Sequence, residues 1–135
     1  MKVFLGGTCS GSTWRDEFTN LLTVEYFNPV VEDWDEEAQL NELKERETCD
    51  FVLYCITPKM EGVYSIAEAV DDSNKRPTRT IFIRVKQDGS FEFSNSQWKS
   101  LSAVSQMIKN NGGNVFSDLK SAAIFINNYK NIEEG

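Results

Sequence analysis

Residues 50–58 read Asp50–Phe51–Val52–Leu53–Tyr54–Cys55–Ile56–Thr57–Pro58. Six consecutive apolar residues stand between an acidic residue and a Thr-Pro pair. A strand that is apolar on both faces is typical of the interior of a parallel sheet, because helices cover both sides of such a sheet. We therefore expect residues 51–56 to form a central strand.

Short apolar runs alternate with segments of helical periodicity on either side of this strand. Together with residues 51–56, the expected strands are residues 2–5, 24–27, 80–85 and 114–116. Between Asp88 and Phe93 we expect a turn and a short extended excursion. Five strands alternating with five helices predict a doubly wound α/β sandwich with a parallel sheet.

The expected helices each have one apolar side. Thr13 and Ser117 are the expected N-caps of the first and last helices, and Gly112–Gly113 the cap that ends the fourth. The expected inward residues are Trp14, Phe18, Leu21 and Leu22 in the first helix, Leu40 and Leu43 in residues 35–48, Val63, Ile66, Ala67 and Val70 in the helix that Gly62 opens, Trp98, Leu101, Val104 and Ile108 in the fourth, and Leu119, Ala122, Ala123 and Ile126 in the last.

The chain has 135 residues, of which 40% are hydrophobic. This length and mixture predict a single domain over residues 1–135 that holds a core without metal or disulfide. No apolar run is long enough to span a bilayer, and the run at residues 1–5 is too short for a signal peptide. Three cysteines without a C-x-x-C pair suit a reducing compartment. We expect a soluble, cytoplasmic protein.

The net charge of −7 is concentrated in residues 25–50, which contain ten acidic residues and only two basic ones, Lys44 and Arg46. This charge argues against a protein that binds the phosphate backbone of nucleic acids. The segment is either a solvated helix face or a polyanion mimic for a basic partner. Because the chain has no histidine, nucleophiles that need a histidine base and zinc sites with histidine ligands are excluded.

Doubly wound sheets bind ligands beyond the carboxyl ends of their strands. The loop of residues 6–12 follows the first strand, contains three glycines and leads into a helix, so it is a candidate anion site. Ser12 stands where a Walker A motif needs lysine, which excludes that motif. The alternative is a flexible turn from strand to helix.

Glu68 lies off the apolar side of the third expected helix, on the same side as Ser65. Both are within two turns of the helix start, at the edge of the sheet where ligands bind. The helix dipole there favours an ionised carboxylate, the form that a nucleophile needs. The alternative is a solvated surface glutamate.

The order of several short motifs resembles the nucleoside 2-deoxyribosyltransferase-like family. The motifs are Val3–Phe4–Leu5–Gly6–Gly7–Thr8, Gly11–Ser12–Thr13–Trp14–Arg15, Tyr26–Phe27–Asn28–Pro29–Val30–Val31–Glu32–Asp33–Trp34, Asp50 before a strand that ends Ile56–Thr57–Pro58, and Gly62–Val63–Tyr64–Ser65–Ile66–Ala67–Glu68–Ala69. The resemblance runs from about Val3 to Val85. It implies a flavodoxin-like three-layer sandwich with a five-stranded parallel sheet. It also implies cleavage or transfer of the N-glycosidic bond of a (deoxy)nucleoside or its 5′-monophosphate.

The resemblance assigns a role to each matching position. Glu68 is the implied nucleophile, which forms a covalent glycosyl-enzyme. The implied substrate-binding residues are Gly6, Gly7, Thr8, Ser12, Trp14 and Arg15 for the sugar or 5′-phosphate, Gly62 and Ser65 beside Glu68, and Asn28, Asp33 and Trp34 for the base. No metal or cofactor is expected. The expected partners are a small-molecule nucleoside or nucleotide and further copies of the chain in a homo-oligomer, with no nucleic acid polymer and no membrane.

The third strand departs from family members that transfer deoxyribose, because it ends without an acidic residue. Glu42 or Glu45 in the preceding helix are the candidates to replace that acid. Without such an acid the chain is either a hydrolase with narrow substrates or a module that only binds. The alternatives to an enzyme are therefore a nucleotide-binding or sequestering module on the same fold, and an acidic interaction protein.

Overall fold

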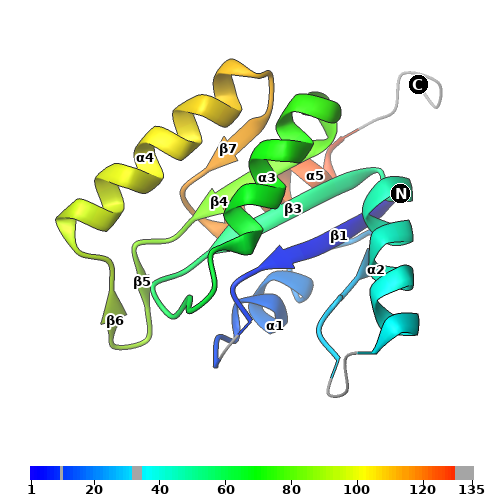
Figure 1. Ribbon diagram of the computed structural model, residues 1–135, viewed down its shortest axis with the longest axis horizontal. Coiled ribbons are helices and arrows are strands. Elements are labelled where there is room, and N and C mark those ends of the chain that lie inside the picture. The colour runs from blue at the N-terminus through cyan, green and yellow to red at the C-terminus, as the bar shows by residue number, and fades with distance from the viewer. Residues whose placement is uncertain (10, 32–34, 130–135) are drawn as a thin grey trace.

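The computed structural model describes residues 1–9, 11–31 and 35–129. Its strands and helices alternate along the chain, as the sequence predicts (Figure 1). The elements are β1 (Lys2–Gly7), α1 (Trp14–Thr19), β2 (Glu25–Phe27), α2 (Glu36–Thr48), β3 (Phe51–Ile56), α3 (Tyr64–Lys75), η1 (Pro77–Arg79), β4 (Thr80–Arg84), β5 (Gln87–Asp88), β6 (Phe91–Glu92), α4 (Asn95–Asn110), β7 (Asn114–Phe116) and α5 (Leu119–Asn127).

Five strands form one parallel sheet in the order β2-β1-β3-β4-β7. This is the strand order of flavodoxin-like folds, in which the chain changes direction across the sheet between the first and third strands. The central strand β3 is buried along its whole length, and its Leu53 lies between Leu5 of β1 and Ile81 of β4. The expectation for residues 51–56 and the predicted fold class are confirmed.

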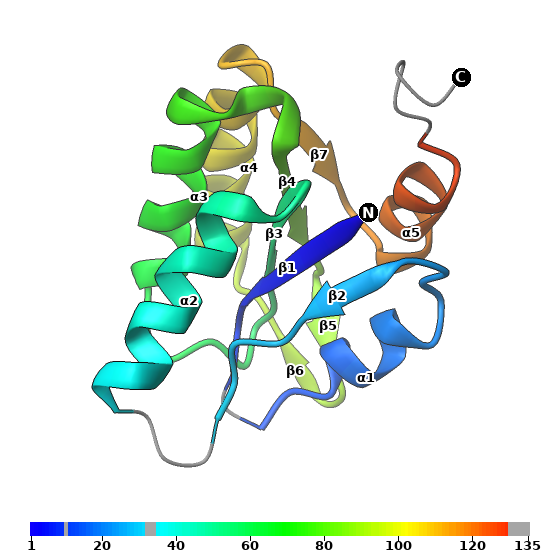
Figure 2. The same ribbon diagram turned by 90° about the vertical axis from the view of Figure 1, so that its right-hand side faces the viewer.

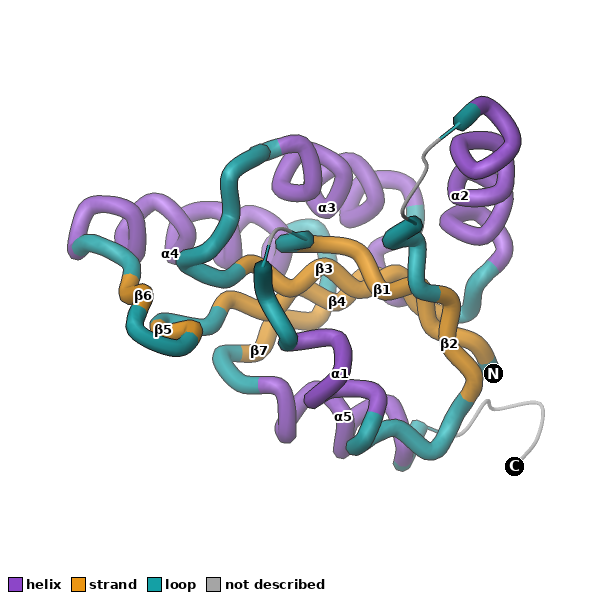
Figure 3. Tube along the Cα trace, turned by 90° about the horizontal axis from the view of Figure 1, so that it is seen from below, coloured by secondary structure: helices purple, strands orange, loops and turns teal. Residues whose placement is uncertain are grey.

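Helices cover both faces of the sheet and complete a three-layer sandwich (Figures 2 and 3). On one face α1 and α5 pack over a core that includes Trp14, Phe18 and Ile126. On the other, α3 and α4 lie over a second core, which includes Tyr54 and Ile108, and α2 lies beside α3. The sandwich leaves the carboxyl ends of β1 and β3 next to the start of α3.

Several local expectations are wrong, each for a physical reason. Leu40 and Leu43 are exposed, because α2 packs at the margin of the sheet. None of the residues of this helix is buried. The buried side of α3 is centred on Ala69, Asp72 and Ser73, so it includes a polar pair that apolar periodicity cannot reveal. Val63 is exposed because it is the N-cap residue that precedes α3, and Ala67, also expected to face inward, lies on the exposed side of the helix.

The ends of the helices also differ from expectation. The first helix, α1, spans only six residues, which leaves Leu21 beyond its end and exposed. Thr13 occupies the N-cap position of α1 without a capping hydrogen bond from its side chain. The N-cap of α5 is Asp118 rather than Ser117, since the Asp118 carboxylate accepts from the Ser121 amide at 2.7 Å.

The excursion expected between residues 88 and 93 is a two-stranded antiparallel hairpin, β5–β6. It projects beside the carboxyl ends of the strands (Figure 1). No helix within the described ranges is long and apolar enough to cross a bilayer.

Candidate functional site

A cleft of about 280 Å³ opens at the carboxyl end of β1. Its volume is near the lower end of the range of small-molecule sites. It is lined by Phe4, Gly6, Gly7, Cys9, Arg15, Pro29, Val30, Val31, Glu42, Ser65 and Glu68. These residues come from β1 and the loop after it, from α1, from the loop after β2, and from α2 and α3. The cleft lies where doubly wound sheets bind ligands.

Gly6 and Gly7 shape the floor of this cleft. A Cβ atom on Gly6 would lie 2.7 Å from the ring of Tyr54, and one on Gly7 would lie 2.1 Å from the carbonyl oxygen of Cys55. Gly7 also has a φ of 118°, which residues with a side chain rarely adopt. Close packing of β1 against β3 therefore requires both glycines. Gly7, which sequence reasoning assigned to ligand approach, is needed first for the fold.

The side chain of Arg15 is buried, and it holds the loop after β1 from inside. Its guanidinium donates to the carbonyl oxygens of Leu5 at 3.1 Å, Thr8 at 2.7 Å and Gly7 at 3.4 Å. It also stacks on the ring of Trp14, with 4.5 Å between the guanidinium carbon and the ring centre. Burial lowers the pKa of Arg15. Arg15 is therefore both a cleft residue and a structural cation, and not a solvated surface charge.

Two other residues predicted to bind substrate, Ser12 and Trp14, do not line the cleft. Trp14 is buried in the core, and its indole donates to the Thr8 carbonyl at 2.8 Å. Ser12 donates to the Asp88 carboxylate of the β5–β6 hairpin at 2.6 Å. Lys59 completes this tie, with its ammonium 3.7 Å from Asp88 and 3.2 Å from the Gly11 carbonyl. Ser12 and Trp14 thus line neither this cleft nor the hollow beside it.

That hollow, of about 200 Å³, lies beside the cleft and shares Gly7, Cys9 and Ser65 with it. It is also lined by Thr8 and Gly62, two of the residues predicted to bind substrate. The hydroxyl of Thr8 accepts from the Thr57 amide at 3.0 Å and so joins the ends of β1 and β3.

Of the residues predicted to bind the base, Asn28 is described by the structure but does not line the cleft. The Asn28 side chain accepts from the Val30 amide at 3.0 Å, which makes it a turn residue at the end of β2. Pro29, Val30 and Val31 follow it and form an apolar wall of the cleft, which sequence reasoning did not single out. Asp33 and Trp34 lie outside the described residues.

Glu68 lies in the second turn of α3, and its side chain reaches the cleft with 12% of its surface exposed. Burial raises the pKa of Glu68 to about 7; Arg46 opposes this shift, and the charges of Glu42 and Asp72 add to it. The helix dipole was expected to favour the ionised carboxylate, but burial raises the pKa of Glu68, so the neutral form is also populated near neutral pH. The alternative of a solvated surface glutamate is wrong.

The structure decides between the two candidate acids of α2. Glu42 lines the cleft together with Glu68. Glu45 instead forms an ion pair with Lys2 at 2.9 Å, near the amino end of β1, and Lys2 lowers its pKa. Glu42 is therefore the carboxylate of α2 that can act in the cleft.

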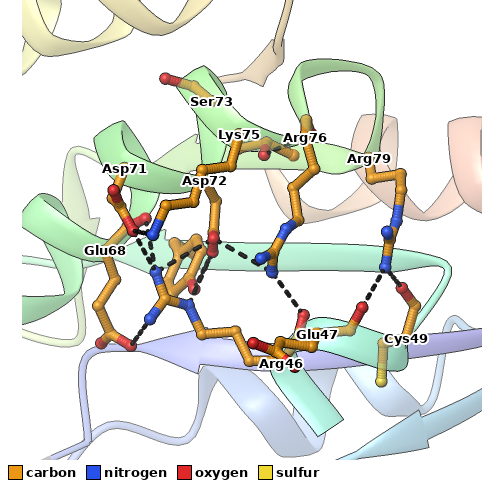
Figure 4. A network of polar contacts seen from close by, with 12 residues as sticks. Arg46, Glu47, Cys49, Glu68, Asp71, Asp72, Ser73, Lys75, Arg76 and Arg79 are labelled. Atoms are coloured by element: carbon orange, nitrogen blue, oxygen red, sulfur yellow. Dashed lines mark hydrogen bonds and ion pairs between the residues drawn. The ribbon is translucent and has the colours of Figure 1, made fainter. Parts of the chain in front are cut away.

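Arg46 is the residue that sequence reasoning missed. Its guanidinium lies between α2 and α3, 3.7 Å from the Glu68 carboxylate and 3.0 Å from that of Asp72 (Figure 4). The available signal was a basic side chain within a strongly acidic helix, which indicates an internal ion pair as readily as a surface charge. No group of Cys, Asp and Glu side chains in the described ranges could hold a metal ion.

Comparison with known proteins finds one family model. The family model described as nucleoside 2-deoxyribosyltransferase like matches residues 1–83, which is more than half of the chain and includes β1, α1, β2, α2, β3 and α3. A search of curated proteins finds no match. Every residue that lines the cleft falls within the matched range. The chain belongs to the nucleoside 2-deoxyribosyltransferase-like family.

Proposed function

We propose that this protein cleaves or transfers the N-glycosidic bond of a nucleoside, with Glu68 as the nucleophile. The observation that carries the proposal is that two carboxylates, Glu68 and Glu42, line one cleft at the carboxyl end of β1 in a member of this family. Reactions at an anomeric carbon commonly use such a pair, one carboxylate as nucleophile and the other as acid or base.

In the first step an oxygen of the Glu68 carboxylate attacks the anomeric carbon of the sugar. The bond from that carbon to the base nitrogen breaks, and its electron pair leaves with the base. The nitrogen takes up a proton from a water molecule that Glu42 orients. In the second step water or another base attacks the anomeric carbon, the ester to Glu68 breaks, and the proton that the attacking group loses passes through Glu42, as general base, to the hydroxide left by the first step. Two inversions give overall retention.

The environment of Glu68 suits both steps. With a pKa of about 7, its carboxylate is available as a nucleophile at neutral pH and is a better leaving group than an alkoxide in the second step. Gly6 and Gly7 let a sugar approach the backbone of β1, and the hydroxyl of Ser65 lies in the same cleft. The apolar wall of residues 29–31 offers a surface for the flat face of a base.

The charges around the cleft favour a nucleoside over its 5′-monophosphate. Arg15 is the single basic residue among the described residues that line it, and the guanidinium already donates to three backbone carbonyls. Lys59 is paired with Asp88. The helix after the loop has only six residues and carries Asp16 and Glu17 in its first turn, so it offers little for an anion. A phosphate would also meet the carboxylates of Glu42 and Glu68.

The test is a panel of ribonucleosides, deoxyribonucleosides and their 5′-monophosphates, each incubated with and without a free acceptor base. Chromatography follows release or exchange of the base. Glu68→Gln is expected to abolish turnover. The control is Glu47→Gln, the same substitution on an exposed side chain at the opposite end of the sheet, and it is expected to keep full activity.

The results also separate the enzyme from the alternative of a binding module. Base release that is lost in Glu68→Gln supports the proposal. Stoichiometric binding of a nucleoside by the folded protein, without turnover of any member of the panel, would refute it and favour the binding module.

A further inference from the structure

The guanidinium of Arg46 contacts three carboxylates of α3, of which Asp71 is the most exposed and Asp72 and Glu68 are the more buried. Its Nε and one terminal nitrogen donate to the two oxygens of Asp72 at 3.0 and 3.1 Å, which is the paired geometry that fixes an arginine in orientation. Its other terminal nitrogen lies 3.7 Å from an oxygen of Glu68. Figure 4 shows the guanidinium between these two side chains of α3.

Asp72 is itself held from several sides. Its carboxylate is fully buried, accepts from the Tyr54 hydroxyl of β3 at 2.5 Å, and lies 3.3 Å from Arg76. Arg76 in turn donates to the Arg46 backbone carbonyl at 2.9 Å. Since β3 is the central strand, Asp72 is an anchor fixed to the core of the sheet. The orientation of Arg46 is therefore set by the core and not by the solvent.

Arg46 also contacts the backbone that carries the nucleophile. The terminal nitrogen of Arg46 that donates to Asp72 lies 3.4 Å from the Glu68 carbonyl oxygen and 3.2 Å from the Asp71 carboxylate. Both the side chain and the main chain of Glu68 thus have Arg46 as a neighbour. Only 14% of the Arg46 side chain and 12% of the Glu68 side chain are exposed, so water screens this pair weakly.

We propose that Arg46 is the positioning residue of Glu68: the guanidinium, fixed by Asp72, holds the Glu68 carboxylate in place for attack at the cleft. This inference rests on the proposed function, in which Glu68 is the nucleophile. A longer contact of 3.7 Å suits the role, because it orients the carboxylate without engaging it in a close paired hydrogen bond that would weaken it as a nucleophile.

The charge of Arg46 has a second effect on the same group. The charged and titratable groups that face Glu68 are Arg46 and Glu42 from α2, Asp71 and Asp72 from α3, Tyr54 from β3, and Arg15 and Cys9 across the cleft. Among them Arg46 is the one that holds the pKa of Glu68 down against burial and against the neighbouring carboxylates. Loss of this cation therefore raises the pKa of Glu68 further.

A purely structural role would make Arg46 equivalent to Arg79. Arg79 also joins the end of α2 to the segment after α3: it donates to the carbonyl oxygens of Glu47 at 2.9 Å, Asp50 at 3.3 Å and Cys49. These contacts lie apart from Glu68 (Figure 4). Arg79→Gln is therefore the matched control for Arg46→Gln.

The test measures the pKa of Glu68 directly and then the pH dependence of turnover. Carboxyl carbon NMR of the labelled full chain gives the pKa in wild type, Arg46→Gln and Arg79→Gln. Arg46→Gln is expected to raise the pKa by about one unit or more. It is also expected to move the acidic limb of kcat/KM by the same amount and to lower kcat. Arg79→Gln is expected to leave the pKa and the limb unchanged.

Arg46→Lys separates position from charge, and it covers the case in which Arg46→Gln does not fold. A single ammonium keeps the charge but cannot pair with Asp72 and face Glu68 at once. The expected result is an acidic limb near that of wild type with a lower kcat.

The outcomes distinguish the inference from the function on which it rests. A Glu68 pKa that is unmoved in Arg46→Gln, or moved equally in Arg79→Gln, overturns the inference, as does full kcat in Arg46→Lys. Failure of the proposed function has a different signature, which is turnover that survives Glu68→Gln or a wild-type protein that turns over no member of the nucleoside panel.

Discussion

Asp72→Asn removes one charge from the centre of the Arg46 network and changes almost nothing else. The amide has nearly the volume of the carboxylate, so no cavity forms. The amide keeps one oxygen that accepts hydrogen bonds. Arg46, which donates to the two Asp72 oxygens at 3.0 and 3.1 Å, and Arg76, which lies 3.3 Å from Asp72, both lose this counter-ion. The two arginines keep their positive charges beside a neutral amide. Because the position of Asp72 is fully buried, water does not replace the lost negative charge.

Breaking a buried ion pair from one side costs about 3–5 kcal/mol. For a domain of this size, that loss lowers the melting temperature by roughly 10–20 °C. Circular dichroism during thermal and urea unfolding measures both quantities. The loss is a large part of the stability of a typical domain, so urea unfolding gives the more direct value.

Asp71→Asn is the matched control for this substitution. Asp71 is the neighbouring residue of the same helix and also contacts Arg46, at 3.2 Å, but its side chain is 46% exposed. Its ion pairs are screened by water, so the melting temperature is expected to fall several times less than in Asp72→Asn. Equal losses in the two variants would refute the reasoning that burial makes Asp72 the anchor of the network.

Four further predictions concern the cleft and the fold. Activity is expected to rise about tenfold in kcat/KM between pH 6 and pH 8 as Glu68, with its pKa of about 7, loses its proton, and a profile that is flat over this range contradicts the assignment. The kcat/KM for a nucleoside is expected to exceed that for its 5′-monophosphate by roughly tenfold or more. Asp88→Asn removes a carboxylate beside the first loop and is expected to reduce this ratio of kcat/KM values. A preference of the wild type for the monophosphate argues against a nucleoside as the substrate. Gly7→Ala is expected to abolish folding, because its Cβ would lie 2.1 Å from the Cys55 carbonyl oxygen at a φ of 118°, and a soluble variant with the wild-type melting temperature would contradict this. The homo-oligomer that the family resemblance implies stays a prediction, which light scattering of the purified chain tests by giving either a multiple of the chain mass or the mass of one chain.

The fold could be predicted from the sequence because its strands are short, almost entirely apolar runs. Residues 51–56 are apolar throughout, and a run of this kind has few places other than the middle of a parallel sheet. Periodicity failed where a helix does not bury an apolar side. Leu40 and Leu43 fit an inward pattern, yet α2 lies at the margin and leaves both exposed.

The candidate site could be predicted in part for a related reason. Glu68, Ser65, Gly6, Gly7 and Arg15 follow from strand ends and family motifs, and the structure brings them to one cleft. The electrostatics could not be predicted, because they depend on contacts between α2 and α3 that have no local signal. Spacing alone does not indicate that Arg46 reaches a buried carboxylate on another helix.

The most direct test of glycosyl transfer through Glu68 is the mass of the intact protein after brief exposure to a nucleoside substrate and an acid quench. The expected result is a population of chains heavier by one pentosyl unit, with the added mass on the peptide that contains Glu68, and no such population in Glu68→Gln. A modified residue other than Glu68, or turnover of the nucleoside with the unmodified mass at every quench time in both proteins, would contradict it.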